Sequence, residues 1–132
     1  MTSSKNDSSD AGFIVVSPVG AMVNRDTDTW GKGDPYCVVT INGQSQKTRP
    51  NFGGGKTPRW SGHTFKFKAK SKTETVEIKL YDDDTGKDDH IGSGRLILTN
   101  LKSEPKDIDV PIEYKKKKIG TCQLKVSYEG AG

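Results

Sequence analysis

The chain is poor in the residues and segments that mark several common classes of protein. Its 132 residues include two cysteines and two histidines, and no C-x-x-C or H-x-x-x-H pair that would indicate a zinc site. No apolar run approaches the roughly 20 residues of a membrane-spanning helix. Residues 1–12 are polar and serine-rich, without the basic and apolar regions of a secretory signal. We therefore predict a flexible tail at 1–12, one domain at 13–129 and a short tail at 130–132, in the cytoplasm.

Cys37 and Cys122 both fall in segments that alternate apolar and polar residues. Because no export signal precedes them, we interpret them as two reduced, buried thiols rather than a disulfide.

What the chain does contain, from residue 13 onward, is a series of short alternating segments separated by turn residues. In TVEIKLY, for example, Val76, Ile78 and Leu80 share one face of a strand. No segment shows a sustained helical period. We predict strands near residues 13–19, 36–42, 45–49, 63–69, 75–81, 94–98, 106–112 and 121–128. The predicted fold class is all-β, with an eight-stranded antiparallel sandwich favoured over a barrel.

Aspartates gather in two of the predicted loops, although the formal net charge is +4. YDDDTGKDDHIG holds five aspartates between Asp82 and Asp89, and DTDTWGKGDPY holds Asp28 and Asp34. A sandwich can bring both loops to one end, where the carboxylates repel one another unless a cation lies between them. Oxygen donors on flexible loops suit calcium better than magnesium. A solvated acidic turn would explain one loop and leave the second as a coincidence.

Two other interpretations of these aspartates fail on the neighbouring residues. An EF-hand that starts at Asp82 needs Gly at its sixth position and Glu at its twelfth, where the chain has Lys87 and Ser93. An aspartyl phosphatase needs a parallel strand buried on both faces, whereas TVEIKLY has one polar face.

The order and spacing of six segments resemble a C2 domain, the calcium-dependent lipid-binding β-sandwich of protein kinase C, synaptotagmin and small plant proteins. The segments are FIVVSPVGAMV, KGDPYCVVTI, KTPRW followed by TFKFK, VEIKLYDDD, DDHIG and GTCQLKVSY. The resemblance covers Phe13 to Tyr128. Opening on FIVV and closing on TCQLKVSY resembles the second, type II, of the family's two permuted topologies, and Trp60 of KTPRW matches a structural tryptophan that packs in the fold.

The resemblance implies a site for two or three calcium ions. Its side-chain ligands would be aspartates of both acidic loops, and two backbone carbonyls would complete the set. The second acidic loop is one residue shorter than the common pattern between Asp84 and Asp89, so Asp88 shares the role of the last ligand. The implied metal-binding residues are Asp28, Thr29, Asp34, Asp82, Asp83, Asp84, Asp88 and Asp89.

The resemblance also implies a mechanism, an electrostatic switch. The acidic loops repel anionic lipid until bound calcium reverses the local sign, and the domain then docks on phosphatidylserine-containing membranes. Trp30 lies at the expected tip of the first loop, where an indole suits the headgroup boundary. Packing of Trp30 onto its own loop is an equal alternative.

Basic residues suggest a second lipid contact. Lys66 and Lys68 share a strand face opposite Phe65 and Phe67, and Lys47 and Arg49 lie in the predicted strand at 45–49, before a turn-rich segment. The resemblance suggests a basic groove that binds phosphoinositides, and a solvated face kept charged for solubility is the alternative. The run at 115–118 is interpreted as a hairpin loop that adds to the attraction for anionic lipid.

The sequence thus predicts a non-enzymatic, calcium-regulated, peripheral membrane-binding module, because no paired nucleophile and base is recognisable. The phenylalanines of TFKFK face the predicted core, which argues against base stacking and nucleic-acid binding. The alternative is a protein-interaction adaptor with the same fold, in which calcium is structural or incidental.

Overall fold

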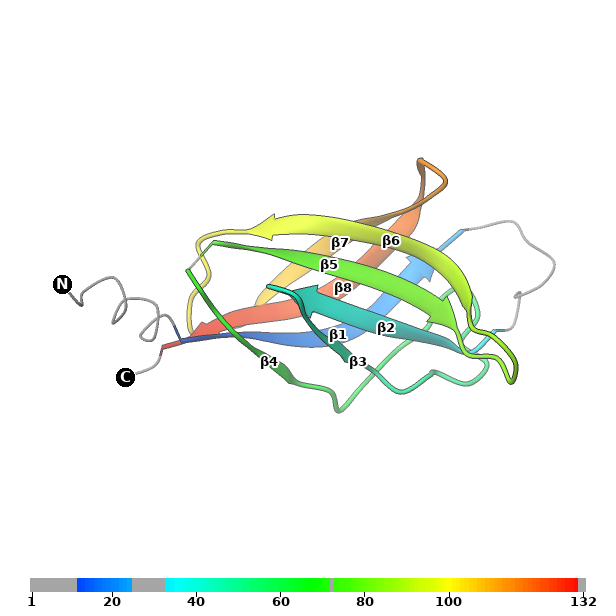
Figure 1. Ribbon diagram of the computed structural model, residues 1–132, viewed down its shortest axis with the longest axis horizontal. Coiled ribbons are helices and arrows are strands. Elements are labelled where there is room, and N and C mark those ends of the chain that lie inside the picture. The colour runs from blue at the N-terminus through cyan, green and yellow to red at the C-terminus, as the bar shows by residue number, and fades with distance from the viewer. Residues whose placement is uncertain (1–11, 25–32, 72, 131–132) are drawn as a thin grey trace.

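The computed structural model describes residues 12–24, 33–71 and 73–130, and the regular structure in these ranges is all β-strand (Figure 1). Every predicted strand is present, and the all-β fold class is confirmed. Several strands are longer than predicted, whereas the strand predicted at 45–49 ends at Lys47 and the strand predicted at 63–69 spans only Phe65–Lys68. The strands are β1 (Phe13–Val23), β2 (Pro35–Ile41), β3 (Gln44–Lys47), β4 (Phe65–Lys68), β5 (Glu74–Asp82), β6 (Asp89–Leu98), β7 (Lys106–Tyr114) and β8 (Lys117–Glu129).

The strands form one antiparallel sheet in the order β3-β2-β5-β6-β7-β8-β1-β4, which folds into two layers. The fold line lies between β6 and β7, which pair only at Ser93 and Glu113. One layer is therefore β3-β2-β5-β6 and the other is β7-β8-β1-β4. The first and last strands, β1 and β8, lie side by side along ten paired positions, as the type II topology requires.

The two outer strands of the sheet, β3 and β4, approach each other through side chains rather than a backbone ladder. The Gln46 Nε2 donates to the carbonyl of Lys66 at 2.9 Å, and the Asn42 Nδ2 reaches the carbonyl of Lys68 at 3.5 Å. The sheet is therefore nearly closed.

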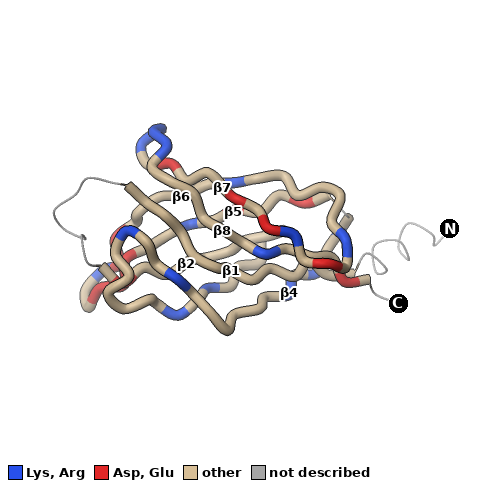
Figure 2. Tube along the Cα trace, turned by 180° about the vertical axis from the view of Figure 1, so that it is seen from behind, with Lys and Arg blue, Asp and Glu red and all other residues tan. Residues whose placement is uncertain are grey.

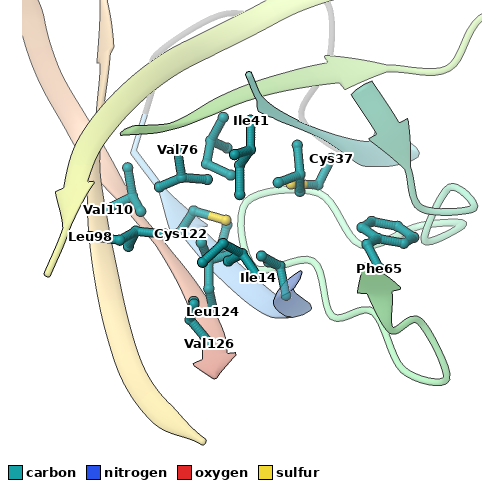
Figure 3. Packing of buried hydrophobic residues seen from close by; sticks show 14 of the residues in the cluster. Ile14, Cys37, Ile41, Phe65, Val76, Leu98, Val110, Cys122, Leu124 and Val126 are labelled. Carbon is teal, nitrogen blue, oxygen red and sulfur yellow. The ribbon is translucent and has the colours of Figure 1, made fainter. Parts of the chain in front are cut away.

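The core lies between the two layers (Figure 3). Alternate residues of β5, Val76, Ile78 and Leu80, are fully buried, as the alternation predicted. Full burial of one such side chain contributes about 1.5–3 kcal/mol. Cys37 and Cys122 are buried free thiols of opposite layers, and the hydrogen bond between them, together with burial, raises the pKa of the Cys37 thiol. The prediction that both thiols are buried is confirmed.

Trp60 connects the core to the start of β2. The indole is buried, and its Nε1 donates to the carbonyl of Pro35 at 3.0 Å. The Trp60 amide donates to the carbonyl of Val19 on β1 at 3.0 Å. The predicted packing role of Trp60 is confirmed, and the contact fixes the chain immediately after Asp34.

Candidate functional site

Three aspartates from neighbouring strands meet at the end of the sandwich opposite the start of β1 and the end of β8 (Figure 1). Asp34 precedes β2, Asp82 ends β5 and Asp89 begins β6. The register pairs Pro35 with Asp82, and Asp82 with Asp89. The strand ladder therefore places these three carboxylates beside one another. We call this region the acidic end.

Asp82 is the buried member of the group, with 7% of its surface exposed. Its Oδ1 accepts a hydrogen bond from the Asp34 amide at 2.8 Å, and the Asp83 amide donates to the Asp34 carbonyl at 3.0 Å. Burial is the main cause that raises the pKa of the Asp82 carboxyl. The Asp34 amide opposes this rise, whereas the nearby carboxylates of Asp34, Asp89 and Asp84 add to it.

Among the described residues, no lysine or arginine forms an ion pair with Asp34, Asp82 or Asp89, although Lys47 helps to lower the pKa of the neighbouring Asp88. The ion pairs there are Lys66–Glu129 and Lys125–Asp107, and neither includes a carboxylate of the acidic end. A buried carboxylate beside others is costly unless a cation neutralises it. The Asp82 charge therefore carries a free-energy penalty that a bound cation would relieve.

Asp88 differs from Asp89 in its contacts. One Asp88 carboxylate oxygen accepts a hydrogen bond from the Tyr36 hydroxyl. The other accepts a hydrogen bond from the Asp84 backbone amide at 3.0 Å. The Tyr36 hydrogen bond is the main cause that lowers the pKa of Asp88, while burial and the same contact raise the pKa of Tyr36. Both Asp88 oxygens thus hold the loop closed, whereas Asp89 is exposed and lies opposite Asp82.

The remaining predicted ligands divide into two groups. Asp83 and Asp84 are exposed on the loop after β5, where the Asp84 Oδ1 accepts the Thr85 amide at 2.7 Å. Asp28, Thr29 and Trp30 lie outside the described residues. Within the described residues, no three His, Cys, Asp or Glu side chains are already arranged to bind a metal. The full ligand set therefore stays a prediction.

A third loop, between β3 and β4, joins the acidic end, and the sequence did not reveal this. The Gly53 amide donates to the Asp34 Oδ1 at 2.8 Å, and the Gly55 amide donates to the Gly33 carbonyl at 3.0 Å. Immediately before Gly53 lies Phe52, whose surface is 75% exposed. An apolar residue inside the turn-rich segment NFGGGKTP was the available signal, but only the fold shows which end of the sandwich it occupies.

The predicted basic set is divided between the two layers. The Lys47 Nζ lies 5.5 Å from the centre of the Tyr36 ring on β2. The Lys66 Nζ instead pairs with Glu129 on β8 at 3.0 Å and lies over Phe13 of β1. Lys66 and Lys68 are exposed opposite buried Phe65 and Phe67, as predicted.

Arg49, the fourth predicted basic residue, follows β3, and its amide donates to the His63 Nε2 at 3.3 Å. The four basic residues therefore lie on or next to the two outer strands, β3 and β4. Lys47 belongs to one layer and Lys66 to the other.

A family profile described as the C2 domain matches residues 14–111. The chain belongs to the C2 domain family. Elicitor-responsive protein 3 of Oryza sativa subsp. japonica is 34% identical over 94 residues, which are 70% of this chain and 65% of that protein. The chain thus spans slightly less than two thirds of this relative.

Two further similarities concern the fold and a longer protein. A solved C2 domain of plant extended synaptotagmin 1 superposes with a TM-score of 0.79 at 23% identity, over 93% of this C2 chain and 98% of that domain. A protein of Arabidopsis thaliana named calcium-dependent lipid-binding protein is 27% identical over 127 residues, 89% of this chain and 25% of its own length. The described ranges contain no helix long and apolar enough to cross a membrane.

We predict that Asp82→Asn stabilises the metal-free protein at neutral pH. The folded pKa of Asp82 is raised above its ordinary value of 3.8, so the free energy of unfolding falls as the pH rises from that value through the folded pKa. The side-chain carbonyl oxygen of the new asparagine can still accept the hydrogen bond from the Asp34 backbone amide. The asparagine side chain carries no charge.

Thermal denaturation in chelator should therefore give a higher Tm for this variant than for wild type near pH 7, and no difference below the ordinary Asp pKa. Asp83→Asn, on the exposed neighbour, is the control. A variant less stable than wild type at both pH values would contradict the assignment of a charge penalty to Asp82.

Proposed function

We propose that this C2 domain is a calcium-regulated module that docks on anionic phospholipid membranes through its acidic end. The observation that carries the proposal is the buried Asp82 carboxylate, which lies beside Asp34 and Asp89 and forms no ion pair with a lysine or arginine among the described residues. The name of the Arabidopsis relative, calcium-dependent lipid-binding protein, supports the same function. A binding module needs no nucleophile or base, so the proposal includes no catalytic step.

The contacts favour a division of roles among the aspartates. Asp34, Asp82 and Asp89 supply the inner oxygen ligands, because neighbouring strands hold them together. Asp84 extends the site along its loop. Asp88 positions the loop through Tyr36 and the Asp84 amide rather than binding the ion. Asp28 and the carbonyls of Thr29 and Asp83 complete the site for two or three ions.

Calcium acts here by changing the charge that a membrane meets. The metal-free aspartates repel phosphatidylserine, and two or three divalent ions reverse that local sign. Lipid phosphate oxygens then fill coordination positions that the protein leaves open. Calcium and lipid therefore increase each other's affinity, as thermodynamic linkage requires.

Phe52 supplies an apolar contact for the same surface. Its loop is fixed to the acidic end because the Gly53 amide binds the Asp34 carboxylate, and its ring is mostly exposed. An aromatic ring beside a cationic site can enter the headgroup boundary when calcium brings the loop to the membrane. Trp30 remains the predicted partner on the first loop.

The first test is cosedimentation with phosphatidylcholine vesicles, with and without phosphatidylserine, in calcium and in chelator. The wild type should pellet only with phosphatidylserine and calcium, and Asp82→Asn combined with Asp84→Asn should abolish pelleting. Asp107→Asn, which removes one exposed carboxylate of an ion pair far along the chain, is the control. Pelleting that is equal in chelator would overturn the calcium switch, and no pelleting under any condition would favour the adaptor.

We predict that Gly33→Ala weakens calcium binding about 10–100-fold, the range seen when the support of a metal ligand is disturbed. A Cβ at Gly33 would lie 2.7 Å from the Asp82 Oδ1 and would displace that carboxylate. Gly86→Ala, in the neighbouring loop, is the matched control because no atom lies within 4 Å of its Cβ position. Isothermal titration calorimetry with calcium measures the effect, and equal affinities of the two variants would contradict the role of Asp82.

Phe52→Ala should weaken calcium-dependent vesicle binding about tenfold or more, because burial of a Phe side chain is worth about 1.5–3 kcal/mol and about 1.4 kcal/mol corresponds to tenfold. Calcium affinity without vesicles should stay unchanged. Ile97→Ala removes another exposed apolar side chain, with 63% of its surface exposed on β6, and should have no effect on vesicle binding. Equal losses in the two variants would show that Phe52 has no special contact with lipid.

A further inference from the structure

The layer β7-β8-β1-β4 has an outer face that no described strand covers, and Figure 2 views this layer from outside. We call it the back face. Its middle strands, β8 and β1, carry mostly uncharged side chains there. Val15 is half-buried and pairs with Ser127, and Met22, with 62% of its surface exposed, pairs with Thr121. A centre with few charges is typical of surfaces that bind another protein.

The two sides of the back face carry charges of opposite sign at one level of the strands. Asp109 is exposed on β7, which forms one side. Arg59 is exposed on the other side, in the segment that precedes β4 and lies beside β1. The two ion pairs of the described residues include neither of these groups. Each charge is therefore available to a partner.

A single row of paired residues joins these two charges, in the order Arg59, Gly20, Gln123 and Asp109. Gly20 pairs with Arg59 on one side and with Gln123 on the other, and Gln123 pairs in turn with Asp109. The next residue, Trp60, is buried in the core, so strand alternation turns the Arg59 side chain outward. Three strand spacings of about 4.8 Å separate the two ends of the row by about 14 Å. The two charges are therefore too far apart to pair within one molecule.

Two copies that pack back face to back face match these ends. In a twofold dimer the same patch of each copy meets the other. An axis that runs parallel to the strands, between β1 and β8, keeps each row facing itself and exchanges its two sides. Arg59 of each copy then faces Asp109 of the other, and this contact occurs twice. Packed sheets lie about 10 Å apart with their strands aligned within about 30°, which suits both the axis and the reach of an arginine.

The same arrangement brings no like charges together in the two neighbouring rows. Lys125 of β8 pairs in register with Ser17 of β1, so each lysine faces a serine of the other copy. Met22 pairs with Thr121, so the exposed methionine faces a threonine. The contacts between the copies are therefore uncharged or of opposite sign along three successive rows.

The size of the back face indicates how strong such a dimer is. Four strands at about 4.8 Å spacing and about nine residues of about 3.3 Å each give an area of roughly 600 Å² on each copy. Specific interfaces bury about 800 Å² on each partner, and weak, transient ones bury less. The area is therefore sufficient for a weak and reversible association.

We propose that the back face binds a second copy of this chain, in a weak twofold dimer whose axis runs parallel to the strands. The centre of the face supplies the contact, and the two Arg59–Asp109 pairs set the orientation. Because the axis follows the strands, the acidic ends of both copies point the same way. The dimer thus presents two docking ends to one membrane and increases avidity. This consequence rests on the calcium-dependent docking proposed above, whereas the dimer itself does not.

Sedimentation velocity of the full chain in chelator, at concentrations up to about 1 mM, measures the association. The wild type should show a reversible equilibrium between monomer and dimer. Arg59→Asp and Asp109→Arg, each made alone, place like charges against each other twice, so each should weaken the dimer about tenfold or more. A wild type that stays monomeric at about 1 mM would overturn the proposal.

Two combinations separate a lost contact from a folding defect. An equal mixture of the Arg59→Asp chain and the Asp109→Arg chain should form a heterodimer, because every facing pair is again of opposite charge. One chain that carries both substitutions should also regain the dimer. If neither combination associates more strongly than the single variants, these two residues do not face each other and the proposal is wrong.

Arg95→Asp is the matched control, because Arg95 is an exposed arginine of β6 on the other layer. It makes the same change of charge and should alter the association less than about twofold. Equal weakening by Arg95→Asp and Arg59→Asp would assign the association to net charge or to another surface and overturn the proposal. Since calcium and lipid are absent throughout, failure of the dimer leaves calcium-dependent docking untouched.

Discussion

The acidic end depends on the backbone junction between Asp34 and Pro35. The Asp34 backbone amide donates a hydrogen bond to Asp82 at the end of β5, and the Asp34 carbonyl accepts one from the Asp83 amide. The Asp34 carboxylate accepts a hydrogen bond from Gly53 in the loop between β3 and β4. The Pro35 carbonyl accepts hydrogen bonds from the Trp60 indole and the Asn51 amide. These bonds join two loops to the buried core at a single point. Carboxylates that repel one another can therefore stay close before any ion binds, since the strand ladder and the core hold their backbones. The site is a property of the sheet as much as of its loops.

This dependence explains what the sequence could and could not predict. Strand alternation revealed all eight strands, because one buried face repeats with a period of two. The DDD and DD clusters indicated an acidic site, and only the register showed that Asp89 rather than Asp88 lies opposite Asp82. The position of Phe52 beside the acidic end was missed because it depends on a hydrogen bond between distant segments.

A row of rings connects the acidic end to the start of the β7–β8 hairpin. Tyr36 stacks on Tyr81 with ring centres 5.6 Å apart, and His90 lies between Tyr81 and Tyr114. Tyr36 also donates a hydrogen bond to Asp88 and so holds the acidic loop closed. The acidic end is therefore connected by side chains to the far layer as well as by the strand ladder.

The side-chain closure between β3 and β4 has a consequence for crowding. Outer strands of a sheet present unpaired backbone groups, on which a second copy could add its own strand and begin a polymer. Here Gln46 and Asn42 occupy the carbonyls of Lys66 and Lys68, and β3 and β4 are each only four residues long. Little free edge is left as a template for such growth. The closure therefore disfavours growth of a shared sheet between copies when the protein is concentrated.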